Sequence, residues 1–396
     1  MRSVAVVGAS LAGLQAVQTL RREGFDGVLH FIGDEPHPPY DRPPLSKQLL
    51  AGDYDTERIA LTSAEDLDEL ELDVHFGDRA VSLAIAPNIV ELASGATLDV
   101  DGVVIATGAR CRTLGEPMYG LFTLRTLDDA LGLRQALDAG PQRLVVVGAG
   151  FIGAEVAATA REKGIDVTMV EAAAMPCERA LGAEMGAVLA DVHRDHGVDL
   201  RLGVGVSSID GDAGRVTGVT LSDGSVVAAD VVVVGIGVIP NTEWLSESGI
   251  DISNGVLCDE TSAAAPSIVA AGDVARFPSR RFGEVMRVEH WDNATTQGIH
   301  AAKRLLHGEQ AGAYDPTPWF WTDQYDRKIQ LAGRTTDFDA VQVVTGDIAE
   351  RRFAAIYRKA DRIVAVLGFN RPRHVMRYRG LIDEGASFDD ALAADF

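Results

Sequence analysis

Two glycine-rich turns in this sequence have the residue types and spacing that bind phosphate groups. They lie at residues 4–13, with the letters VAVVGASLAG, and at residues 144–153, with the letters LVVVGAGFIG. In each, a short β-branched run comes first and an alanine-rich stretch follows, which predicts strand, turn and helix. Such a turn lets the backbone approach a pyrophosphate, whose negative charge faces the free N–H groups of the helix N-terminus. Two such turns predict two dinucleotides and electron transfer between them.

Acidic residues come after the next expected strand in both copies. Asp34 and Glu35 follow the first copy's second strand, and Glu171 follows the corresponding strand of the second copy. A carboxylate in this position accepts hydrogen bonds from ribose hydroxyls. Glu171 would also repel a 2′-phosphate, and three alanines without an arginine follow it, so we expect NADH rather than NADPH. The alternative is that Glu171 is only a surface acid.

The first turn departs from the usual pattern, because Ser10 stands where the middle glycine normally lies. Serine is small enough for close approach, and its hydroxyl can reach a phosphate oxygen. The alternative is a tight strand–helix connection without a ligand.

The elements expected around these turns indicate an α/β fold. Two Rossmann-like dinucleotide-binding domains are predicted, with a small C-terminal α+β domain after them. The expected strands and helices lie at residues 11–23, 28–32, 100–105, 127–139, 152–163, 167–170, 216–221, 226–227, 231–234, 268–270, 294–306, 329–332, 340–344 and 363–369. The predicted domains are 1–108 with 242–312, then 109–241, then 313–396.

Composition excludes several classes of protein. The chain has 396 residues, 46% of them hydrophobic and 24% charged, as in a globular protein of more than one domain. A net charge of −22 argues against nucleic acid as a partner. No apolar run spans a bilayer and no signal peptide is recognised, so we expect no membrane and a cytoplasmic location. The three cysteines, Cys111, Cys177 and Cys258, show no redox or zinc spacing, and no metal site is expected.

Further segments resemble one family along essentially the whole chain. The order of motifs is similar to that of flavoprotein pyridine-nucleotide reductases, and two segments resemble the ferredoxin reductases of oxygenase systems in particular. These two are PYDRPPLSK at 39–47 and PWFWTDQ at 318–324. Other matching segments are 106–108, 124–127, 235–241, 271–273 and 289–291.

The resemblance implies FAD in the first domain and NADH in the second. The implied FAD-binding residues are Gly8, Ser10, Leu11, Ala12, Gly13, Asp34, Glu35, Arg42, Lys47, Val81, Ala106, Thr107, Gly108, Arg125, Gly272, Asp273, Glu289 and Trp291. The implied NADH-binding residues are Gly148, Gly150, Phe151, Ile152, Gly153, Glu171, Gly235, Ile236 and Gly237. The alternatives are a helix cap for Asp273 and a surface ion pair for Arg125.

Lys47 and Glu155 are the expected catalytic pair beside the isoalloxazine, since a lone buried charge is strongly disfavoured. Phe151 is expected to stack where nicotinamide enters, with Trp319 and Trp321 over the other flavin face. The alternative for Lys47 and Glu155 is a structural ion pair. The alternative for the three aromatic residues is core packing.

The function implied by the resemblance is transfer of electrons from NADH through FAD to a separate [2Fe–2S] ferredoxin that supplies a monooxygenase or dioxygenase. The alternatives are a rubredoxin reductase, an NADH oxidase or quinone reductase of the same fold, and an NADH-sensing flavoprotein that acts through protein binding. Disulfide reductases are disfavoured, because residues 43–50 contain no cysteine. The basic run from Arg371 to Arg379 would attract an acidic ferredoxin or be an ordinary solvated face.

Overall fold

The computed structural model describes residues 1–395, which form two compact units. The first unit comprises residues 1–41, 57–110 and 239–318, and the second comprises 42–56, 111–238 and 319–396. Each unit contains one mainly parallel sheet with a strand that leads into a glycine-rich turn, and the second unit also holds an antiparallel C-terminal sheet. The predicted α/β class, with two Rossmann-like sheets and a C-terminal α+β region, is confirmed. The three domain boundaries stay a prediction.

The first unit is built on a six-stranded sheet with the order β19-β20-β7-β1-β2-β3. The central strand β1 pairs in parallel with β2 and β7, and its residues Val4 to Val7 are buried. Such a continuous apolar run is typical of a parallel strand covered on both faces. The strands are β1 (Ser3–Val7), β2 (Val28–Gly33), β3 (Leu72–Phe76), β7 (Gly102–Ile105), β19 (Ala263–Ala265) and β20 (Ile268–Ala270).

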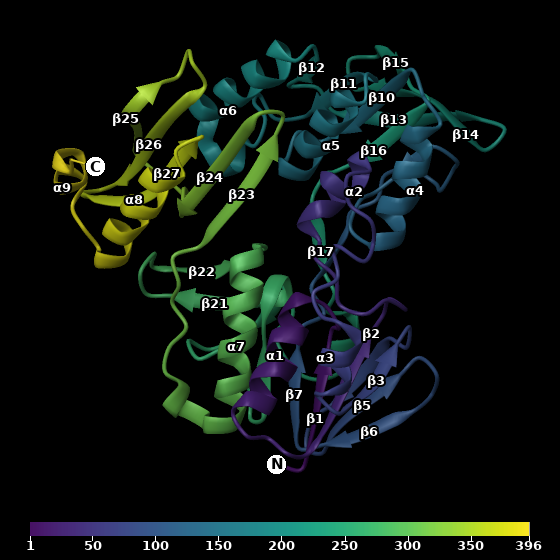
Figure 1. The fold of residues 1–396 in the computed structure, drawn as a ribbon, viewed down its shortest axis with the longest axis vertical. Coiled ribbons are helices and arrows are strands. Elements are labelled where there is room, and N and C mark those ends of the chain that lie inside the picture. Colours follow the sequence, from purple (N-terminus) through teal and green to yellow (C-terminus); the bar gives the residue numbers. More distant parts are fainter. Residues whose placement is uncertain (396) are drawn as a thin grey trace. The chain divides into compact units, whose positions relative to one another are not determined.

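Helices cover one face of this sheet, and small antiparallel sheets contribute to the core on the other. Helices α1 (Leu11–Arg22) and α7 (Trp291–His307) lie side by side (Figure 1) and share a core with Val4 and Phe31. Val7 and Ile32, from the opposite face, belong to a second core. That core includes residues of β4 (Ala80–Ala84), β5 (Asn88–Leu92), β6 (Thr97–Val100), β18 (Val256–Leu257), β21 (Ala275–Ser279) and β22 (Glu284–Arg287). Short helices in this unit are α3 (Ala64–Asp68), η2 (Glu243–Leu245), η3 (Gly272–Val274) and η4 (Gly308–Ala311).

The second unit repeats the plan with a five-stranded sheet of order β12-β11-β10-β16-β9. Its strands are β9 (Leu121–Phe122), β10 (Arg143–Val147), β11 (Asp166–Glu171), β12 (Asp199–Leu202) and β16 (Val231–Val234). The helices of this part are η1 (Pro43–Ser46), α2 (Gln48–Ala51), α4 (Leu127–Asp138), α5 (Phe151–Glu162) and α6 (Glu178–Asp195). A smaller sheet of this unit comprises β13 (Val206–Asp212), β14 (Arg215–Leu221) and β15 (Val226–Ala228). The pair β8 (Ala109–Cys111) and β17 (Val238–Pro240) contains the two points where the chain passes from the residues of one unit to those of the other.

The C-terminal residues form an antiparallel sheet of order β23-β24-β27-β26-β25. Its core is shared with α6, where Leu181 and Leu189 lie in one cluster with Phe353 and Tyr357. The elements are β23 (Trp319–Gln324), β24 (Arg327–Gly333), β25 (Ala340–Asp347), β26 (Arg352–Lys359), β27 (Arg362–Phe369), α8 (Pro372–Glu384) and α9 (Phe388–Ala393).

Helix α6, with 18 residues, has no counterpart among the elements expected from the sequence. Gly182 interrupts it with a φ of 76°, and a Cβ there would lie 2.5 Å from the ring of Phe338. Beyond the break, the buried residues Met185, Val188, Leu189 and Val192 keep the three- and four-residue spacing of a helix, so the sequence carried a signal for α6 that the prediction missed. Strands β4–β6 and β26 were not expected either.

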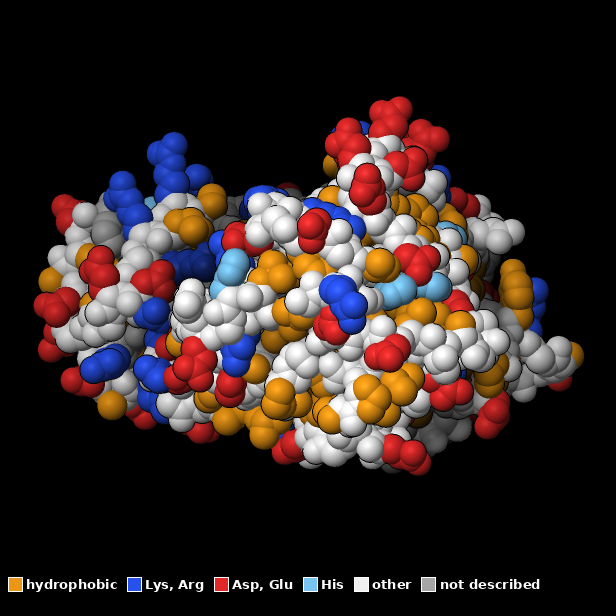
Figure 2. Space-filling view, turned by 90° about the horizontal axis from the view of Figure 1, so that it is seen from below, with side chains coloured by type: hydrophobic (Ala, Val, Ile, Leu, Met, Phe, Trp, Pro, Cys, Tyr) orange, Lys and Arg blue, Asp and Glu red, His pale blue; other side chains and the backbone are white. Residues whose placement is uncertain are grey.

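Charged side chains of both signs lie on the surface. Figure 2 shows acidic side chains spread over the visible face, with lysine and arginine side chains between them. Within residues 1–395, no helix combines the length and the apolar character that a membrane span requires.

Candidate functional site

The first glycine-rich turn excludes side chains at two positions. Gly8 has a φ of 122°, and a Cβ there would lie 2.0 Å from the carbonyl oxygen of Ala106. A Cβ at Gly13 would lie 1.9 Å from the carbonyl oxygen of Gly8. Ser10 is the N-cap of α1, which continues through Leu11 and Ala12. The helix N-terminus therefore follows directly on the turn, which is the arrangement that holds a pyrophosphate.

The two acids after β2 differ in their surroundings. Asp34 is exposed, whereas Glu35 is partly buried and its carboxylate accepts a hydrogen bond of 2.5 Å from the Tyr40 hydroxyl. Asp34 therefore has the more accessible carboxylate for a ribose. The backbone N–H of Gly77, just after β3, donates to the carbonyl oxygen of Glu35, so the edge strand also fixes this segment.

The segment after β7 is held by polar contacts within the first unit. The Thr107 hydroxyl donates to the carbonyl oxygen of Asn241 at 2.7 Å, and the Asn241 amide donates back to the carbonyl oxygen of Thr107 at 2.9 Å. Ala106 is buried and Gly108 has a φ of 62°. Val81, on β4, is 37% exposed and therefore has apolar surface available to a ligand.

Four further predicted FAD residues lie around η3 and the start of α7. The N–H of Gly272 donates to the buried side chain of Gln297, and the carbonyl of Asp273 accepts from Arg287, which also pairs with Glu289. Trp291 begins α7. Its indole N–H donates to the Asp41 carboxylate at 2.8 Å. The sequence reasoning did not assign these supporting roles to Gln297, Arg287 and Asp41.

In the second glycine-rich turn, backbone atoms also lie too close to two glycines for a side chain to fit. A Cβ at Gly148 would lie 2.4 Å from the carbonyl oxygen of Gly235, and one at Gly153 would lie 2.2 Å from that of Gly148. At Gly150 the nearest atom would be 4.0 Å away, so space is open there. Ile152 and Ile236 are exposed beside the turn, and Gly237 has a φ of 99°.

Glu171 is hydrogen-bonded to the second glycine-rich turn. Its two carboxylate oxygens accept hydrogen bonds from the backbone N–H groups of Ala149, at 2.7 Å, and Ala173, at 2.8 Å. A carboxylate has about four lone-pair positions, so acceptor capacity remains for a ribose diol. Glu171 therefore both orders the turn and offers oxygen atoms to a nucleotide.

Lys47 and Glu155, the expected catalytic pair, lie in direct contact. The Lys47 ammonium is 2.9 Å from a Glu155 carboxylate oxygen, and the two side chains are 11% and 4% exposed. The Ser46 hydroxyl donates to the same oxygen, and the Thr322 hydroxyl donates to the other at 2.7 Å. Each Glu155 oxygen thus has a donor, which is what a buried carboxylate requires. The partners Ser46 and Thr322 lie within the two family-specific sequence segments, but neither was predicted as a partner of Glu155.

Two predicted arginines come together in the second unit. The Arg42 guanidinium donates to the carbonyl oxygen of Arg125 at 2.5 Å, and the backbone N–H of Arg125 donates to Asp129 at 3.0 Å. The fork of donors on each guanidinium suits a phosphate or a flavin oxygen.

The predicted aromatic residues pack against one another. Phe151 lies 4.6 Å from Phe320 between ring centroids, and Trp319 and Trp321 stack at 5.3 Å. These contacts agree with the core-packing alternative for Phe151, while the indole N–H of Trp319 is buried without a hydrogen-bond partner. Flavin stacking by these three residues stays a prediction.

The structure brings together one group of residue types that bind metals, although no metal site was expected from the sequence. Among residues 1–395, His30, Asp73 and His75 bring one ligand atom each within 4.8 Å of one another. The spacing could not show this, because His30 is 43 residues from Asp73 and only strand pairing joins them.

The geometry at each turn fits a dinucleotide, because glycine is required where the backbone must pass closely and a carboxylate follows the next strand. Family models agree with this. The model "Pyridine nucleotide-disulphide oxidoreductase" matches residues 2–298, and the model "Reductase C-terminal" matches residues 319–396.

Curated relatives match over almost the whole chain. Rhodocoxin reductase of Rhodococcus erythropolis is 38% identical, covering 99% of this chain and 92% of the relative. Putidaredoxin reductase of Pseudomonas putida is 34% identical, covering 99% and 94%.

Solved structures have the same fold. The covalent putidaredoxin reductase–putidaredoxin complex matches with a TM-score of 0.92 at 34% identity, over 97% of this chain and 93% of that one. The ferredoxin reductase for the CYP199A2 system from Rhodopseudomonas palustris matches with a TM-score of 0.91 at 38% identity, over 99% of both chains. The chain therefore belongs to the pyridine nucleotide-disulphide oxidoreductase family, in the branch of the ferredoxin reductases of oxygenase systems, and is an oxidoreductase that uses FAD and NAD(H).

Proposed function

We propose that this protein passes electrons from NADH through FAD to a separate [2Fe–2S] ferredoxin, which supplies a monooxygenase or dioxygenase. The observation that carries the proposal is the buried pair of Lys47 and Glu155, in a setting where residues 43–50 contain no cysteine. A disulfide reductase needs a cysteine beside its flavin, and this chain offers a lysine instead. Relatives named for rhodocoxin, putidaredoxin and dioxygenase systems support the assignment.

The glycine-rich turn of the first unit would hold FAD and that of the second would hold NADH. When bound, FAD takes up two electrons with a hydride and releases the electrons singly. The turn at Gly8 and Gly13 would accommodate the FAD pyrophosphate beside the N-terminus of α1, while Asp34 accepts from a ribose. The turn at Gly148 and Gly153 would do the same for NADH.

Polar groups of the second unit would set the charge and orientation at the reacting end. Ser46 and Thr322 fix the Glu155 carboxylate, and Glu155 fixes the Lys47 ammonium. A positive charge held in this way favours an electron-rich flavin nearby. Arg42 and Arg125 would donate to phosphate or flavin oxygens, and Glu171 would select NADH by repelling a 2′-phosphate.

The test is reduction of ferredoxins by the purified protein. We expect yellow protein with one FAD per chain, and NADH-dependent reduction of at least one [2Fe–2S] ferredoxin in a panel that also contains rubredoxins and quinones. Reduction of a rubredoxin, a quinone or oxygen in preference to every ferredoxin would overturn the proposed acceptor. Slow flavin reduction with a change in oligomeric state and no acceptor turnover would indicate a sensor instead.

We further propose that the protein works in the cytoplasm. The three cysteines are free thiols, as is usual in a reducing compartment.

A further inference from the structure

We propose that His30, Asp73 and His75 bind one divalent transition-metal ion at the edge of the six-stranded sheet, with Zn²⁺ as the best fit. The Asp73 carboxylate oxygen Oδ2 lies 2.7 Å from His30 Nδ1 and 3.1 Å from His75 Nε2. The two imidazole rings are 5.8 Å apart between centroids. Three ligand atoms therefore already point toward one small volume.

Strand register explains why these side chains meet. His30 on β2 and Asp73 on β3 are direct partners in the parallel ladder, and Ile32 pairs with His75. Asp73 and His75 are two residues apart, so their side chains lie on the same face of β3. Because β3 is the last strand of the sheet, no further strand crosses this position.

The ligand set suits a tetrahedral ion with one open position. Two imidazole nitrogens and one carboxylate oxygen are ligand types that Zn²⁺ takes at about 2.0–2.2 Å, with water in the fourth position. Tetrahedral ligands at that range are about 3.4 Å apart. The 2.7 Å contact of His30 with Asp73 would therefore open by about 0.7 Å and the 3.1 Å contact of His75 with Asp73 by about 0.3 Å. Imidazole ligands also favour Cu²⁺ and Ni²⁺, whereas Mg²⁺ and Ca²⁺ prefer oxygen.

The burial of the three side chains also suits an ion. The side chains of His30 and His75 are 13% and 20% exposed, so they are ordered against the sheet, while Asp73 at 51% leaves a path for an ion.

Metal binding would strengthen the connection between β2 and β3 next to the predicted FAD ribose residues. His30 lies four positions before Asp34 in the sequence. After β3, the N–H groups of Gly77 and Asp78 donate to the carbonyl oxygens of Glu35 and Gly33. An ion that ties the two strands together would stabilise the folded unit, because it binds the folded chain in preference to the unfolded one.

The test is titration of the FAD-loaded protein, free of any histidine tag, with Zn²⁺ by calorimetry. We expect one ion per chain and a rise in melting temperature. The variants His30→Ala, Asp73→Asn and His75→Ala should each weaken binding by about tenfold or more. The matched control is His307→Ala, which removes a histidine that pairs with a carboxylate, Glu23, at 2.9 Å. This control should bind Zn²⁺ as the unchanged protein does.

X-ray absorption at the zinc edge gives a second readout that does not depend on the variants' stability. We expect two imidazole ligands in the zinc-loaded protein. Binding that is equal in all four variants, or a zinc spectrum without imidazole scattering, would overturn the proposal and leave the three residues as a hydrogen-bonded triad only. Electron transfer to ferredoxin is measured separately, so failure of this proposal would leave the proposed function intact.

Discussion

Glu155 illustrates how a single buried carboxylate is stabilised. Removing such a group from water costs several kcal/mol, which only a close charge partner and complete hydrogen bonding offset. Lys47 supplies the charge, and the hydroxyls of Ser46 and Thr322 supply hydrogen bonds to the two oxygens. The Thr159 hydroxyl in turn donates to the carbonyl oxygen of Ser46 at 2.9 Å, which fixes the position of Ser46.

We expect Lys47→Ala to lower stability by about 3–5 kcal/mol, because it leaves an unpaired buried charge, and to slow flavin reduction by NADH. The double variant Lys47→Met with Glu155→Gln removes both charges and should regain most of the stability but not the rate. Calorimetry and stopped-flow absorbance measure the two effects. If the double variant recovers both, the pair is structural and has no kinetic role.

A substitution of Glu171 would change two properties at once. Its carboxylate accepts a hydrogen bond from Ala149 of the glycine-rich turn, and we expect its charge to face the position of a 2′-phosphate. A variant that tests specificity must therefore be compared with one that removes another backbone-bound carboxylate outside the glycine-rich turn.

We expect Glu171→Ala with Ala172→Arg to shift the ratio of kcat/KM for NADH over NADPH toward NADPH by about tenfold or more, since about 1.4 kcal/mol corresponds to a factor of ten. The control is Glu178→Ala, which removes a carboxylate that accepts from the backbone N–H of Met175 at 3.1 Å. Steady-state kinetics with both nucleotides measures the ratio. An equal shift in both variants would count against selection by Glu171.

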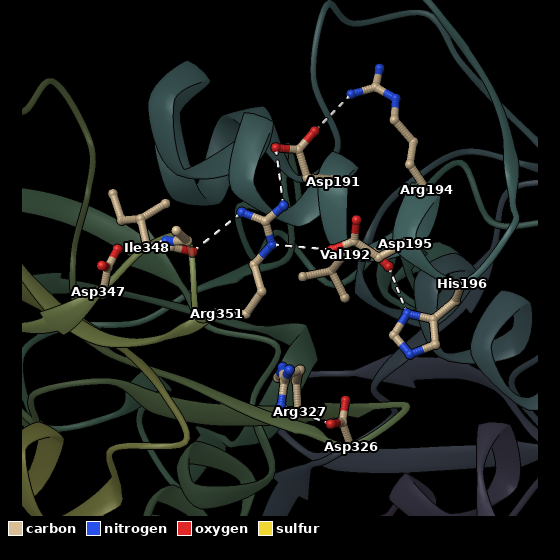
Figure 3. A network of polar contacts seen from close by, with 11 residues as sticks. Asp191, Val192, Arg194, Asp195, His196, Asp326, Arg327, Asp347, Ile348 and Arg351 are labelled. Carbon is tan, nitrogen blue, oxygen red and sulfur yellow. Dashed lines mark hydrogen bonds and ion pairs between the residues drawn. The ribbon is translucent and has the colours of Figure 1, made fainter.

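At the scale of elements, α6 connects the NADH-side sheet to the C-terminal sheet. Apolar residues of α6 share a core with β24, β26 and β27, and Tyr325 stacks on His196 at 3.7 Å between ring centroids. Figure 3 shows Arg351, just before β26, pointing toward two acids of α6. Its guanidinium lies 3.3 Å from both Asp191 and Asp195, and it also donates to the carbonyl oxygen of Ile348.

We expect Arg351→Ala to destabilise the second unit by about 1 kcal/mol, because its guanidinium is 17% exposed and pairs with two carboxylates that are about half exposed. A loss of about 2–4 °C in Tm follows for a unit of this size. The control Arg194→Ala removes an exposed pair with Asp191 and should change Tm by less. Equal effects in calorimetry would show that Arg351 does not connect the elements.

At the scale of the whole molecule, the uneven distribution of charge bears on the binding of a partner protein. The chain has a net charge of −22, yet α8 carries Arg373, His374, Arg377 and Arg379 within one helix. Arg373 and Arg377 are exposed. A local basic surface on an acidic protein attracts an acidic partner and increases its rate of encounter, an effect that salt weakens.

We expect Arg373→Glu with Arg377→Glu to raise KM for an acidic ferredoxin several-fold at low salt, without changing reduction of ferricyanide by NADH. The control exchanges two exposed arginines elsewhere, Arg143→Glu with Arg201→Glu. Steady-state assays over a range of ionic strength measure both. If the control raises KM equally, the effect comes from net charge and α8 is not the docking surface.

The sequence by itself determined the glycine-rich turns, the parallel strands around them and the dinucleotide class. These features are local: the close contacts of Gly13 with Gly8 and of Gly153 with Gly148 lie within each turn, and buried parallel strands such as β1 and β10 read as continuous apolar runs. The pairing of Lys47 with Glu155 was also expected from the family resemblance.

Tertiary structure alone decided which distant side chains meet. The hydroxyl of Thr322 reaches Glu155 across 167 positions of the chain, and His30 meets Asp73 through strand register. The apolar residues of α6 after Gly182 have helical spacing in the sequence, but only the folded chain shows that they pack against the C-terminal sheet. Such contacts have no local signature, since they depend on how the folded chain brings separate elements together.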